Sequence, residues 1–258
     1  MNARAACFDS LSLESLTSRA ALLTRTDTKY IVDLPALDAL IDSVWRDHLV
    51  LEIEGRRVFN YETIYFDSPE LHVYHAHVQG RRRRFKVRSR RYIDSGLNVF
   101  EVKLKGLRGT TVKHQLAIDA ADHGTISSAA AVFAGDILDS AYGHRLPDAY
   151  EPALAMHYQR VTLASRENVE RMTWDFALRF DAGGALSPTH VIVETKSERG
   201  RGTADRALAN LGVRPMSVSK YCAGIGLSRA DVRVNPWAAA LRRYFVPSEP
   251  LSAAAVGR

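Results

Sequence analysis

FKVRSRRY at residues 85–92 and VFEVKLK at residues 99–105 are neighbouring segments in which charged residues alternate with apolar ones. Successive side chains of an extended strand point to opposite faces of a sheet. One face of the first segment therefore carries Lys86, Arg88, Arg90 and Tyr92, and Val87 points to the other face. The alternation predicts two half-buried β-strands, the first with nearly all of its cations on one face.

The second segment repeats the pattern, with Glu101, Lys103 and Lys105 on one face and Val102 and Leu104 on the other. Like charges that lie directly opposite each other destabilise a pair of strands. Two cations about 6 Å apart repel by roughly 2 to 3 kcal/mol at an effective dielectric constant of about 20. A face on which cations predominate therefore needs an anion to offset the repulsion, and a bound phosphate would supply it.

The composition limits the number of domains and the class of partner. With 258 residues, of which 46% are hydrophobic, the chain can build one substantial core, and we expect a single domain over residues 1–258. The 35 Lys and Arg residues exceed the 29 Asp and Glu residues, which gives a formal net charge of +6. This excess favours anionic partners without choosing among nucleic acid, a membrane surface and phosphorylated metabolites.

Cysteine usage and hydropathy indicate the compartment. Cys7 and Cys222 are too few and too isolated for a disulfide framework or a cysteine metal site. The N-terminal residues lack the uninterrupted apolar run of a secretory signal, and no stretch reaches the roughly 18 apolar residues of a membrane span. We therefore expect a soluble, cytoplasmic protein with no membrane segment.

Helical and strand patterns alternate along the chain. Helices are expected over residues 8–24, 34–45, 125–142, 203–211 and 219–229, and strands over 25–32, 61–67, 85–92, 99–105, 111–118, 153–165, 171–180 and 190–197. The clearest helix follows Asp33, a good N-cap residue, and has Pro35 in its first turn. If the strands close into a barrel, their apolar faces can pack outward against the helices while the charged faces line the interior.

Eight short motifs follow one another along the chain: R-x-D-x-K-Y at 25–30, Y-x-T-x-Y-F-D at 61–67, K-x-R-x-R-x-Y at 86–92, F-E-V-K at 100–103, Y-x-R at 158–160, R-x-x-x-D at 171–175, E-x-K at 194–196 and S-K-Y at 219–221. Their order and spacing resemble the VTC domain, the polyphosphate polymerase domain of the triphosphate tunnel metalloenzyme superfamily. The resemblance covers about residues 22–228 and leaves residues 229–258 as a C-terminal extension.

The resemblance implies an α+β fold, in which about eight antiparallel strands form a closed barrel with helices packed around it. The tunnel inside would bind ATP and inorganic polyphosphate together with Mn²⁺ or Mg²⁺. Catalysis would use no side-chain nucleophile, because phosphoryl transfer depends mainly on alignment and charge stabilisation.

The resemblance also assigns roles to individual residues. The expected catalytic residues are Arg88, Arg90, Lys103, Arg160, Arg171 and Lys220. The expected phosphate-binding residues are Lys29, Lys86, Lys113, Lys196 and Ser219. Glu194 is the expected metal ligand, and a plain ion pair is the alternative interpretation of this residue. These residue types suit the task, because Arg meets phosphate oxygens in a bidentate way and Mg²⁺ often needs only one or two protein carboxylates.

Several residues keep two interpretations. Glu101 is a metal ligand or the ion-pair partner of a neighbouring arginine, and Asp175 is a metal ligand or a partner that orients Arg160 or Arg171. The run Arg81–Arg84 is a solvated loop or a funnel for polyanions. His72, His75 and His77 have spacing compatible with a turn, but no further clustered ligand completes a zinc site.

The function also keeps alternatives. The leading expectation is a polyphosphate polymerase that transfers the γ-phosphate of ATP to a growing chain. The alternatives are a triphosphatase and a polyphosphate-binding module without catalysis. Nucleic acid is not expected, because no aromatic platform interleaves with the basic positions. Family polymerases often carry a lysine where this chain has Ser217, and the E-x-E-x-K signature of the adenylate cyclase branch is missing. The oligomeric state is left open.

Overall fold

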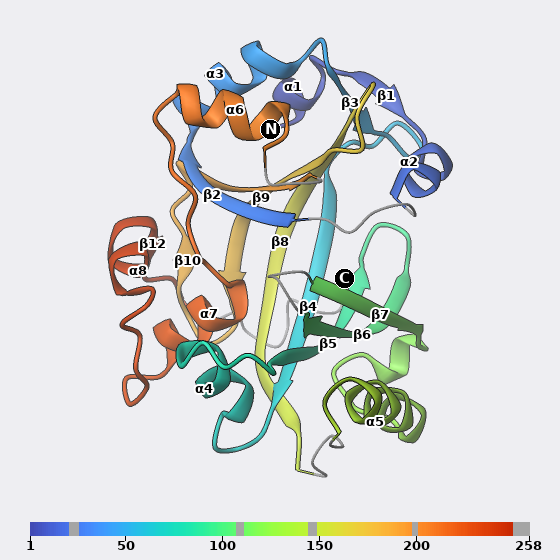
Figure 1. Ribbon diagram of the computed structural model, residues 1–258, viewed down its shortest axis with the longest axis vertical. Helices are drawn as coiled ribbons and strands as arrows, with labels where there is room; N and C mark the ends of the chain where they lie inside the picture. Colours follow the sequence, from blue (N-terminus) through green and yellow to red (C-terminus); the bar gives the residue numbers. More distant parts are fainter. Residues whose placement is uncertain (21–25, 107–110, 144–148, 198–200, 250–258) are drawn as a thin grey trace. The chain divides into compact units, whose positions relative to one another are not determined.

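The computed structural model describes residues 1–20, 26–106, 111–143, 149–197 and 201–249 (Figure 1). The α-helices are α1 (Asn2–Ala5), α2 (Leu13–Ala20), α3 (Leu34–Val44), α4 (His72–Val78), α5 (Ser128–Tyr142), α6 (Thr203–Asn210), α7 (Lys220–Ser228) and α8 (Ala238–Tyr244). The strands are β1 (Asp9–Leu11), β2 (Thr26–Asp33), β3 (His48–Leu51), β4 (Phe59–Asp67), β5 (Phe85–Tyr92), β6 (Leu97–Lys105), β7 (Thr111–Ala117), β8 (Glu151–Ser165), β9 (Arg171–Phe180), β10 (Ala185–Leu186), β11 (His190–Ser197) and β12 (Phe245–Val246).

Hydrogen bonding between neighbouring strands follows the order β12-β10-β9-β8-β4-β5-β6-β7, and the remaining strands branch from this path. Strand β11 pairs with β2 and β9, and β3 pairs with β8 and β1. The fold is α+β with a largely antiparallel sheet, as predicted, and the pair β1–β3 is parallel.

The predicted closed barrel is wrong, because the pairing of the described residues leaves the sheet open, with β7 at one end. Closure would require a second neighbour for β7. This strand instead exposes side chains such as Lys113 and Gln115, and charged side chains are a common means by which edge strands avoid further pairing. The predicted number of about eight strands is also too low, since the short strands β1, β3, β10 and β12 are additional.

The described residues form two compact units, each assembled from separate stretches of the chain. Unit 1 comprises Met1–Asn60, Tyr158–Ala177 and Leu186–Ser217, and unit 2 comprises Tyr61–His157, Leu178–Ala185 and Val218–Arg258. Neither unit is continuous in sequence. The single domain expected over residues 1–258 stays a prediction.

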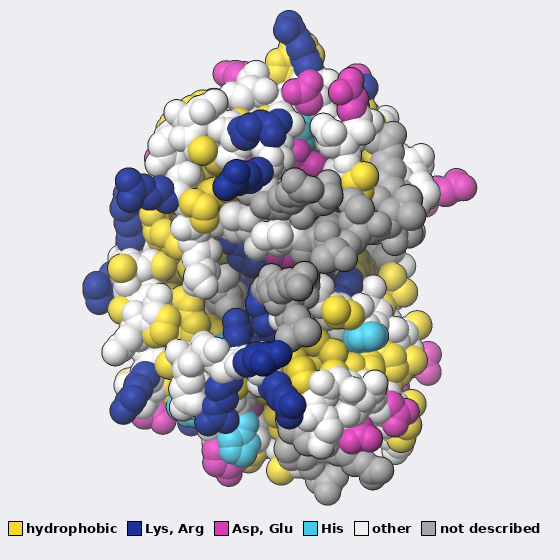
Figure 2. Space-filling model, viewed as in Figure 1, with side chains coloured by type: hydrophobic (Ala, Val, Ile, Leu, Met, Phe, Trp, Pro, Cys, Tyr) yellow, Lys and Arg dark blue, Asp and Glu magenta, His cyan; other side chains and the backbone are white. Residues whose placement is uncertain are grey.

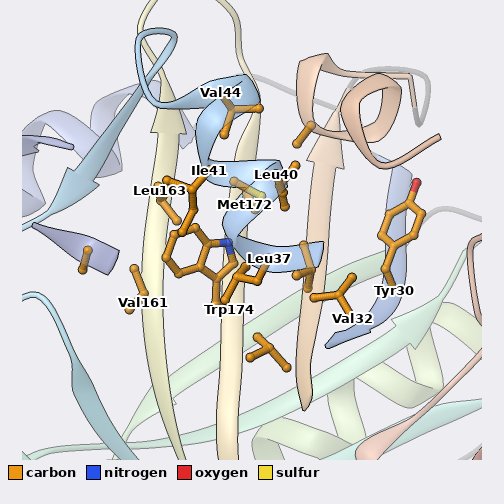
Figure 3. Close-up of a cluster of buried hydrophobic side chains, with 14 of the residues drawn as sticks. Tyr30, Val32, Leu37, Leu40, Ile41, Val44, Val161, Leu163, Met172 and Trp174 are labelled. Atoms are coloured by element: carbon orange, nitrogen blue, oxygen red, sulfur yellow. The ribbon is translucent and has the colours of Figure 1, made fainter. Parts of the chain in front are cut away.

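The core of unit 1 lies between helices α3 and α6 and one face of the strands β2, β11 and β9. Trp174 is fully buried and packs edge-on against Phe8, with ring centroids 5.7 Å apart. Figure 3 shows the Trp174 ring below α3, beside Leu37 and Ile41. The odd and even positions of β9 therefore separate, with Met172, Trp174 and Phe176 in the core and the intervening residues on the other face.

A buried carboxylate joins α6 to this sheet. Asp205 accepts hydrogen bonds from Tyr30 Oη (2.8 Å), Thr195 Oγ1 (2.5 Å), Ser197 Oγ (3.1 Å) and the backbone N–H of Gly202 (2.9 Å). Tyr30 belongs to β2, and Thr195 and Ser197 belong to β11. A single side chain thus fixes the start of α6 against two strands, and every donor that it binds is satisfied.

The core of unit 2 lies between α5 and the apolar face of β4, β5 and β6. Phe66, Val87, Phe100 and Val102 are buried there, and they pack with Ala130, Ala134 and Leu138 of α5. Helix α5 begins at Ser127, whose side chain accepts from Ala130 N–H, and it ends at Gly143 in a left-handed conformation. This packing covers one face of the strands, so the opposite face carries their charged residues.

The first predicted helix is partly wrong. Residues 9–11 form β1 rather than the start of a helix, and α2 begins at Leu13, where Ser12 Oγ accepts a hydrogen bond from the backbone N–H of Ser15. The end of that helix, residues 21–24, lies outside the described residues. Arg25 of the first motif and residues 250–258 of the C-terminal extension also lie outside them. The other predicted helices correspond to α3, α5, α6 and α7, within a few residues at their ends.

Close packing explains why α7 contains Gly224. A Cβ atom at this position would lie 2.7 Å from Phe180 Cδ1 and would also clash with Leu154. We expect Gly224→Ala to lower the free energy of unfolding by about 1 to 3 kcal/mol, because both neighbours are buried in a packed core. Urea denaturation measures this.

The matched control for that substitution is Gly135→Ala in α5. Apart from Gly135 itself, its two neighbours along the chain and the nearby backbone of α5, no heavy atom of the described residues lies within 4 Å of a Cβ built at Gly135. Alanine is a better helix former than glycine, and the change is expected to raise stability by up to about 1 kcal/mol. Equal effects of the two substitutions would contradict the packing of α7 against Leu154 and Phe180.

Candidate functional site

In unit 2, strands β5, β6 and β7 place three lysines in one cross-strand row. Lys86 lies directly opposite Lys103, and Lys103 lies directly opposite Lys113. The next row pairs Arg88 with Glu101. The predicted strands and their charged face are therefore confirmed. The lysine row sets like charges opposite each other, an arrangement that destabilises the sheet unless an anion compensates for it.

The carboxylate of Glu101 is fully buried among these cations. Arg88 Nε donates to Glu101 Oε2, and Arg90 Nη1 lies 3.8 Å from the same oxygen. The other oxygen, Oε1, lies 3.3 Å from Lys113 Nζ and 2.7 Å from Gln115 Nε2. Of the two interpretations of Glu101, the structure shows the ion pair with arginine.

These contacts also fix the protonation of Glu101. Burial raises its pKa, but Arg88, Arg90 and Lys113 lower it by more, so the net pKa lies well below the ordinary value. Glu101 is therefore ionised in the folded protein. Its carboxylate orients Arg88 and Arg90, two of the predicted catalytic residues.

A second buried carboxylate, Asp67 at the end of β4, connects α4 and α7. It accepts hydrogen bonds from the backbone N–H groups of Ser68 (2.8 Å), Val73 (2.8 Å) and Tyr74 (2.9 Å) and from the hydroxyl of Tyr221. Burial raises the pKa of Tyr221, and Asp67 raises it further, so this hydroxyl stays protonated and acts as the donor. The first turn of α7 is thereby held to β4.

Two predicted site residues occupy the start of α7. Ser219 is its N-cap, and the Ser219 side chain accepts from the backbone N–H of Cys222 at 3.4 Å. Because this cap uses the hydroxyl oxygen as an acceptor, the hydroxyl proton can still be donated. Lys220 follows directly and precedes the anchored Tyr221. The bond from Tyr221 to Asp67 therefore also fixes the backbone that carries Lys220.

Lys and Arg side chains gather on the visible surface of unit 2 around α4 and the start of β5 (Figure 2). Within the run Arg81–Arg84, the first three arginines are exposed and Arg84 is half-buried. Arg81 Nε donates to Gln79 Oε1 at 2.7 Å, and Arg83 Nη1 donates to the carbonyl of Tyr142 at 3.1 Å. The run is solvated, and its use as a funnel for polyanions stays a prediction.

His77 lies in the last turn of α4, close to the lysine row. Its Nδ1 donates to the carbonyl of Val73 at 2.8 Å, which leaves Nε2 without the proton in the neutral ring. Burial lowers the pKa of His77 to about 3, and the charges of Lys86, Arg84 and Lys103 add to this effect. The ring is therefore neutral over the physiological pH range.

In unit 1, β11 lies between β2 and β9 and brings several predicted residues onto one face. Glu194 lies opposite Lys29 of β2, and Lys196 lies opposite Asp27 of β2 and Arg171 of β9. Glu194 Oε2 is 3.4 Å from Lys29 Nζ, and Glu194 Oε1 is 2.5 Å from Lys196 Nζ. Lys196 Nζ is also 3.1 Å from Asp27 Oδ1. This face carries both signs of charge.

Glu194 forms ion pairs with Lys29 and Lys196. Glu194 is 8% exposed, and its charge is the main reason why the pKa of Lys29 is raised. Lys196 lies within ion-pair distance of two carboxylates, those of Glu194 and Asp27. The ammonium group of Lys196 thus lies between two acidic side chains, so this place favours positive charge.

Strand β9 and strand β8 contribute two arginines to unit 1. Arg160 binds the fully buried Asp175 in a bidentate way, with Nε 2.5 Å from Oδ1 and Nη2 2.8 Å from Oδ2. Arg171 Nη2 donates to the carbonyl of Leu16 at 3.1 Å. Of the two interpretations of Asp175, the structure shows the partner that orients Arg160.

The family model of the VTC domain matches residues 24–228. The chain belongs to the VTC domain family. No curated protein matches the sequence.

Solved structures of low sequence identity are similar to this VTC domain. HpAC1 from Hippeastrum, a candidate adenylyl cyclase described with a dominant triphosphatase activity, is 13% identical with a TM-score of 0.51, over 80% of this chain and 98% of its own. A candidate adenylate cyclase from Bacillus halodurans is 11% identical with a TM-score of 0.49, over 76% and 96% of the two chains. The first of these supports the fold of triphosphate tunnel metalloenzymes.

Membership of the VTC domain family implies that a divalent metal ion is used. The acidic residues of unit 1 suit such an ion. Glu194 and Asp27 offer carboxylate oxygens, the donor type that Mg²⁺ and Mn²⁺ prefer. Among the described residues, no group of three or more His, Cys, Asp and Glu side chains could hold a metal ion. The fit is therefore to an ion that keeps one or two protein carboxylates and completes its shell with water and phosphate.

Two residues of this VTC domain received no phosphate-binding or metal-binding role from the sequence. Tyr65 of β4 lies directly opposite Arg88 and shares the face of Arg90. The alternation in residues 61–67 shows which face of the strand Tyr65 occupies, but the pairing of β4 with β5 is needed to place it beside Arg88. Asp27 is the second, since its alternation with Lys29 in the first motif places both on one face.

None of the helices in the part of the chain that the structure describes has the length and apolar character needed to span a membrane.

Proposed function

We propose that this VTC domain is a metal-dependent polyphosphate polymerase that transfers the γ-phosphate of ATP to an inorganic polyphosphate chain. The observation that carries the proposal is the row of Lys86, Lys103 and Lys113 beside Arg88 and Arg90. Cations at this density favour a ligand with several adjacent negative charges, and a chain of phosphates has that spacing of charge.

The two units receive different roles in the proposal. In unit 2, the arginines and lysines Lys86, Arg88, Arg90, Lys103, Lys113 and Lys220 bind phosphate oxygens, and Ser219 donates a hydrogen bond. In unit 1, Lys29, Arg160, Arg171 and Lys196 bind phosphate, and Glu194 holds the metal ion. A bound Mn²⁺ or Mg²⁺ would neutralise charge that develops on the phosphate oxygens.

The reaction needs no nucleophile from the protein. An oxygen of the terminal phosphate of the acceptor chain forms a bond to the γ-phosphorus of ATP, the bond to the β–γ bridging oxygen breaks, and ADP leaves. Phosphoryl transfer of this kind depends on in-line alignment and on cations around the transferred group. Glu101 and Asp175 support it by holding Arg88 and Arg160 in place.

A triphosphatase is the competing proposal, in which water replaces the polyphosphate acceptor. HpAC1, which shares the fold, is described with a dominant triphosphatase activity. Its 13% identity concerns the fold alone, so the choice between acceptors needs an experiment. A binding module without catalysis is the third possibility, and Glu194 among cations argues against it, since binding alone has little need for a buried carboxylate.

The test is to incubate the purified protein with ATP and Mn²⁺, or with Mg²⁺, and to separate long polyphosphate from free phosphate. We expect long polyphosphate and ADP. Free phosphate as the sole phosphorus product would replace the polymerase by a triphosphatase. Tight binding of polyphosphate with no consumption of ATP would leave only the binding module.

A further inference from the structure

Tyr65 is placed like a ligand-contacting residue, although none of the motifs assigns it a role. It belongs to β4 and lies directly opposite Arg88 of β5, while its neighbour on the same face, Thr63, lies opposite Arg90. The side chain is 5% exposed. Its ring lies 5.6 Å from the guanidinium carbon of Arg88, measured at the ring centroid, and 5.1 Å from the ring of Tyr221.

The hydroxyl oxygen of Tyr65 accepts a hydrogen bond, but its proton has no acceptor among the described residues. Arg88 Nη1 donates to Tyr65 Oη at 2.8 Å, and a guanidinium has no lone pair that could accept in return. Among the described residues, no oxygen accepts the hydroxyl proton of Tyr65. The carboxylate of Glu101, which also binds Arg88, is engaged by Lys113 and Gln115 as well.

A buried donor without an acceptor is costly, by roughly 1 to 3 kcal/mol. Asp67 would be an alternative acceptor, but its oxygens take the hydroxyl of Tyr221 and three backbone N–H groups. The surroundings of Tyr65 thus consist of donors and positive charge. What this hydroxyl lacks is an anionic oxygen on the charged face of β4 and β5.

We propose that Tyr65 is a phosphate-binding residue, which donates its hydroxyl proton to a phosphate oxygen of a triphosphate or polyphosphate bound by Arg88 and Arg90. The inference rests on the proposed function of this face and adds a neutral donor to a set of cations. Because the hydroxyl receives a bond from Arg88 and gives one to the ligand, Tyr65 would also fix the angle at which Arg88 meets the phosphate.

The charges around Tyr65 strengthen it as a donor. Burial raises the pKa of Tyr65, but Arg88, Lys86 and Arg90 of β5 lower it by more, so the net pKa lies below the ordinary value. The other groups that face it are neutral Tyr221 of α7 and, through Arg88, ionised Glu101 of β6. A more acidic hydroxyl forms a stronger hydrogen bond to an anionic oxygen.

The test uses the full chain and tripolyphosphate as the probe. Calorimetric titration is expected to show binding to Tyr65→Phe that is at least about tenfold weaker than binding to the unchanged protein, as for the loss of one hydrogen bond to a charged group. The control is Tyr142→Phe, which removes a hydroxyl of the same unit that donates to the carbonyls of Arg84 and Lys105 at 3.0 Å. We expect that variant to bind within about twofold of the unchanged protein.

A second readout separates ligand contact from an effect on folding. With tyrosine labelled at Cζ with ¹³C, the resonance that Tyr65→Phe removes should titrate below the pH of ordinary tyrosines, and saturation with tripolyphosphate should move its titration upward, because the anion favours the protonated donor. Binding of tripolyphosphate by Tyr65→Phe at unchanged affinity, or a resonance that does not respond to it, overturns the role of Tyr65 alone. If no form of the protein binds tripolyphosphate, the proposed function fails together with it.

Discussion

Glu194→Gln is expected to reduce metal-supported transfer of phosphate from ATP by about a thousandfold, because a bound metal ion supplies several kcal/mol of charge stabilisation in reactions of this class. Glutamine keeps the size of the side chain and one hydrogen-bonding oxygen. It removes the negative charge that Lys29 and Lys196 approach to 3.4 and 2.5 Å. Mn²⁺ affinity, measured by the electron paramagnetic resonance of the free ion, should fall together with the rate.

The control is Asp38→Asn, which removes a carboxylate of unit 1 that pairs with Arg4 on α1 and is half exposed. Its activity and Mn²⁺ affinity should match those of the unchanged protein, and the circular dichroism of both variants should be native. Full activity of Glu194→Gln with native Mn²⁺ affinity would remove Glu194 from the proposed metal site.

Glu101→Gln is expected to lower the free energy of unfolding by about 3 kcal/mol at neutral pH. The reason is that removal of one partner from a buried ion pair leaves the other charge buried without compensation. Here the partners are Arg88, whose side chain is 13% exposed, and Arg90, whose side chain is 8% exposed. Urea denaturation followed by circular dichroism measures the change.

The depressed pKa of Glu101 determines the pH range in which this carboxylate stabilises the folded protein. The pKa of Glu101 is depressed in the folded protein, so its contribution to stability is fully present above the ordinary unfolded pKa of about 4.3. As the pH falls below that value the contribution is lost, at about 1.4 kcal/mol per pH unit. The difference in stability between the unchanged protein and Glu101→Gln should therefore be constant above about pH 5 and shrink in acid.

An exposed carboxylate of the same unit provides the comparison. Glu70→Gln changes a solvated side chain and should alter the free energy of unfolding by less than about 0.5 kcal/mol at every pH. A stability difference for Glu101→Gln that stays constant down to acid pH would mean that the buried carboxylate does not titrate as its contacts require.

The part of the fold that could be predicted is the part with long, regular alternation. Strands β5 and β6 each carry enough alternating residues to define two faces, and the observed pairing of Lys86 with Lys103 and Arg88 with Glu101 follows from their register. Helix α3 was predictable for a different reason, since Asp33 caps it by accepting from Ala36 N–H at 2.8 Å. Both signals are local in sequence.

What could not be predicted depends on contacts between distant segments. Strand β1 has three residues and exists because it pairs with β3, about 40 positions later in the chain, so no local alternation reveals it. The open sheet was missed for a similar reason, because alternation shows that β7 is a strand but not whether a second strand pairs with it. Barrel closure is a property of pairing that sequence patterns do not contain.

The candidate site shows the same division. The type and face of Arg88 and Arg90 could be read from one strand, whereas the choice between two roles for Glu101 depended on side chains from β5 and β7. Asp175 was undecided for the same reason, since its bidentate partner Arg160 lies on another strand. Residue types indicate which chemistry is available, and only the spatial neighbours of a carboxylate show whether arginine already occupies it.

The pairing of β2 with β11 has a consequence for how the chain folds as it is synthesised. Tyr30 and Val32 of β2 belong to the core of unit 1, but the strand that completes their sheet begins only at His190. Strands β4 to β7 are consecutive and can pair while the ribosome is still adding β8, whereas β2 must wait with an open edge for most of translation. We therefore expect chains truncated before residue 190 to retain the β5–β6 hairpin and to aggregate through β2.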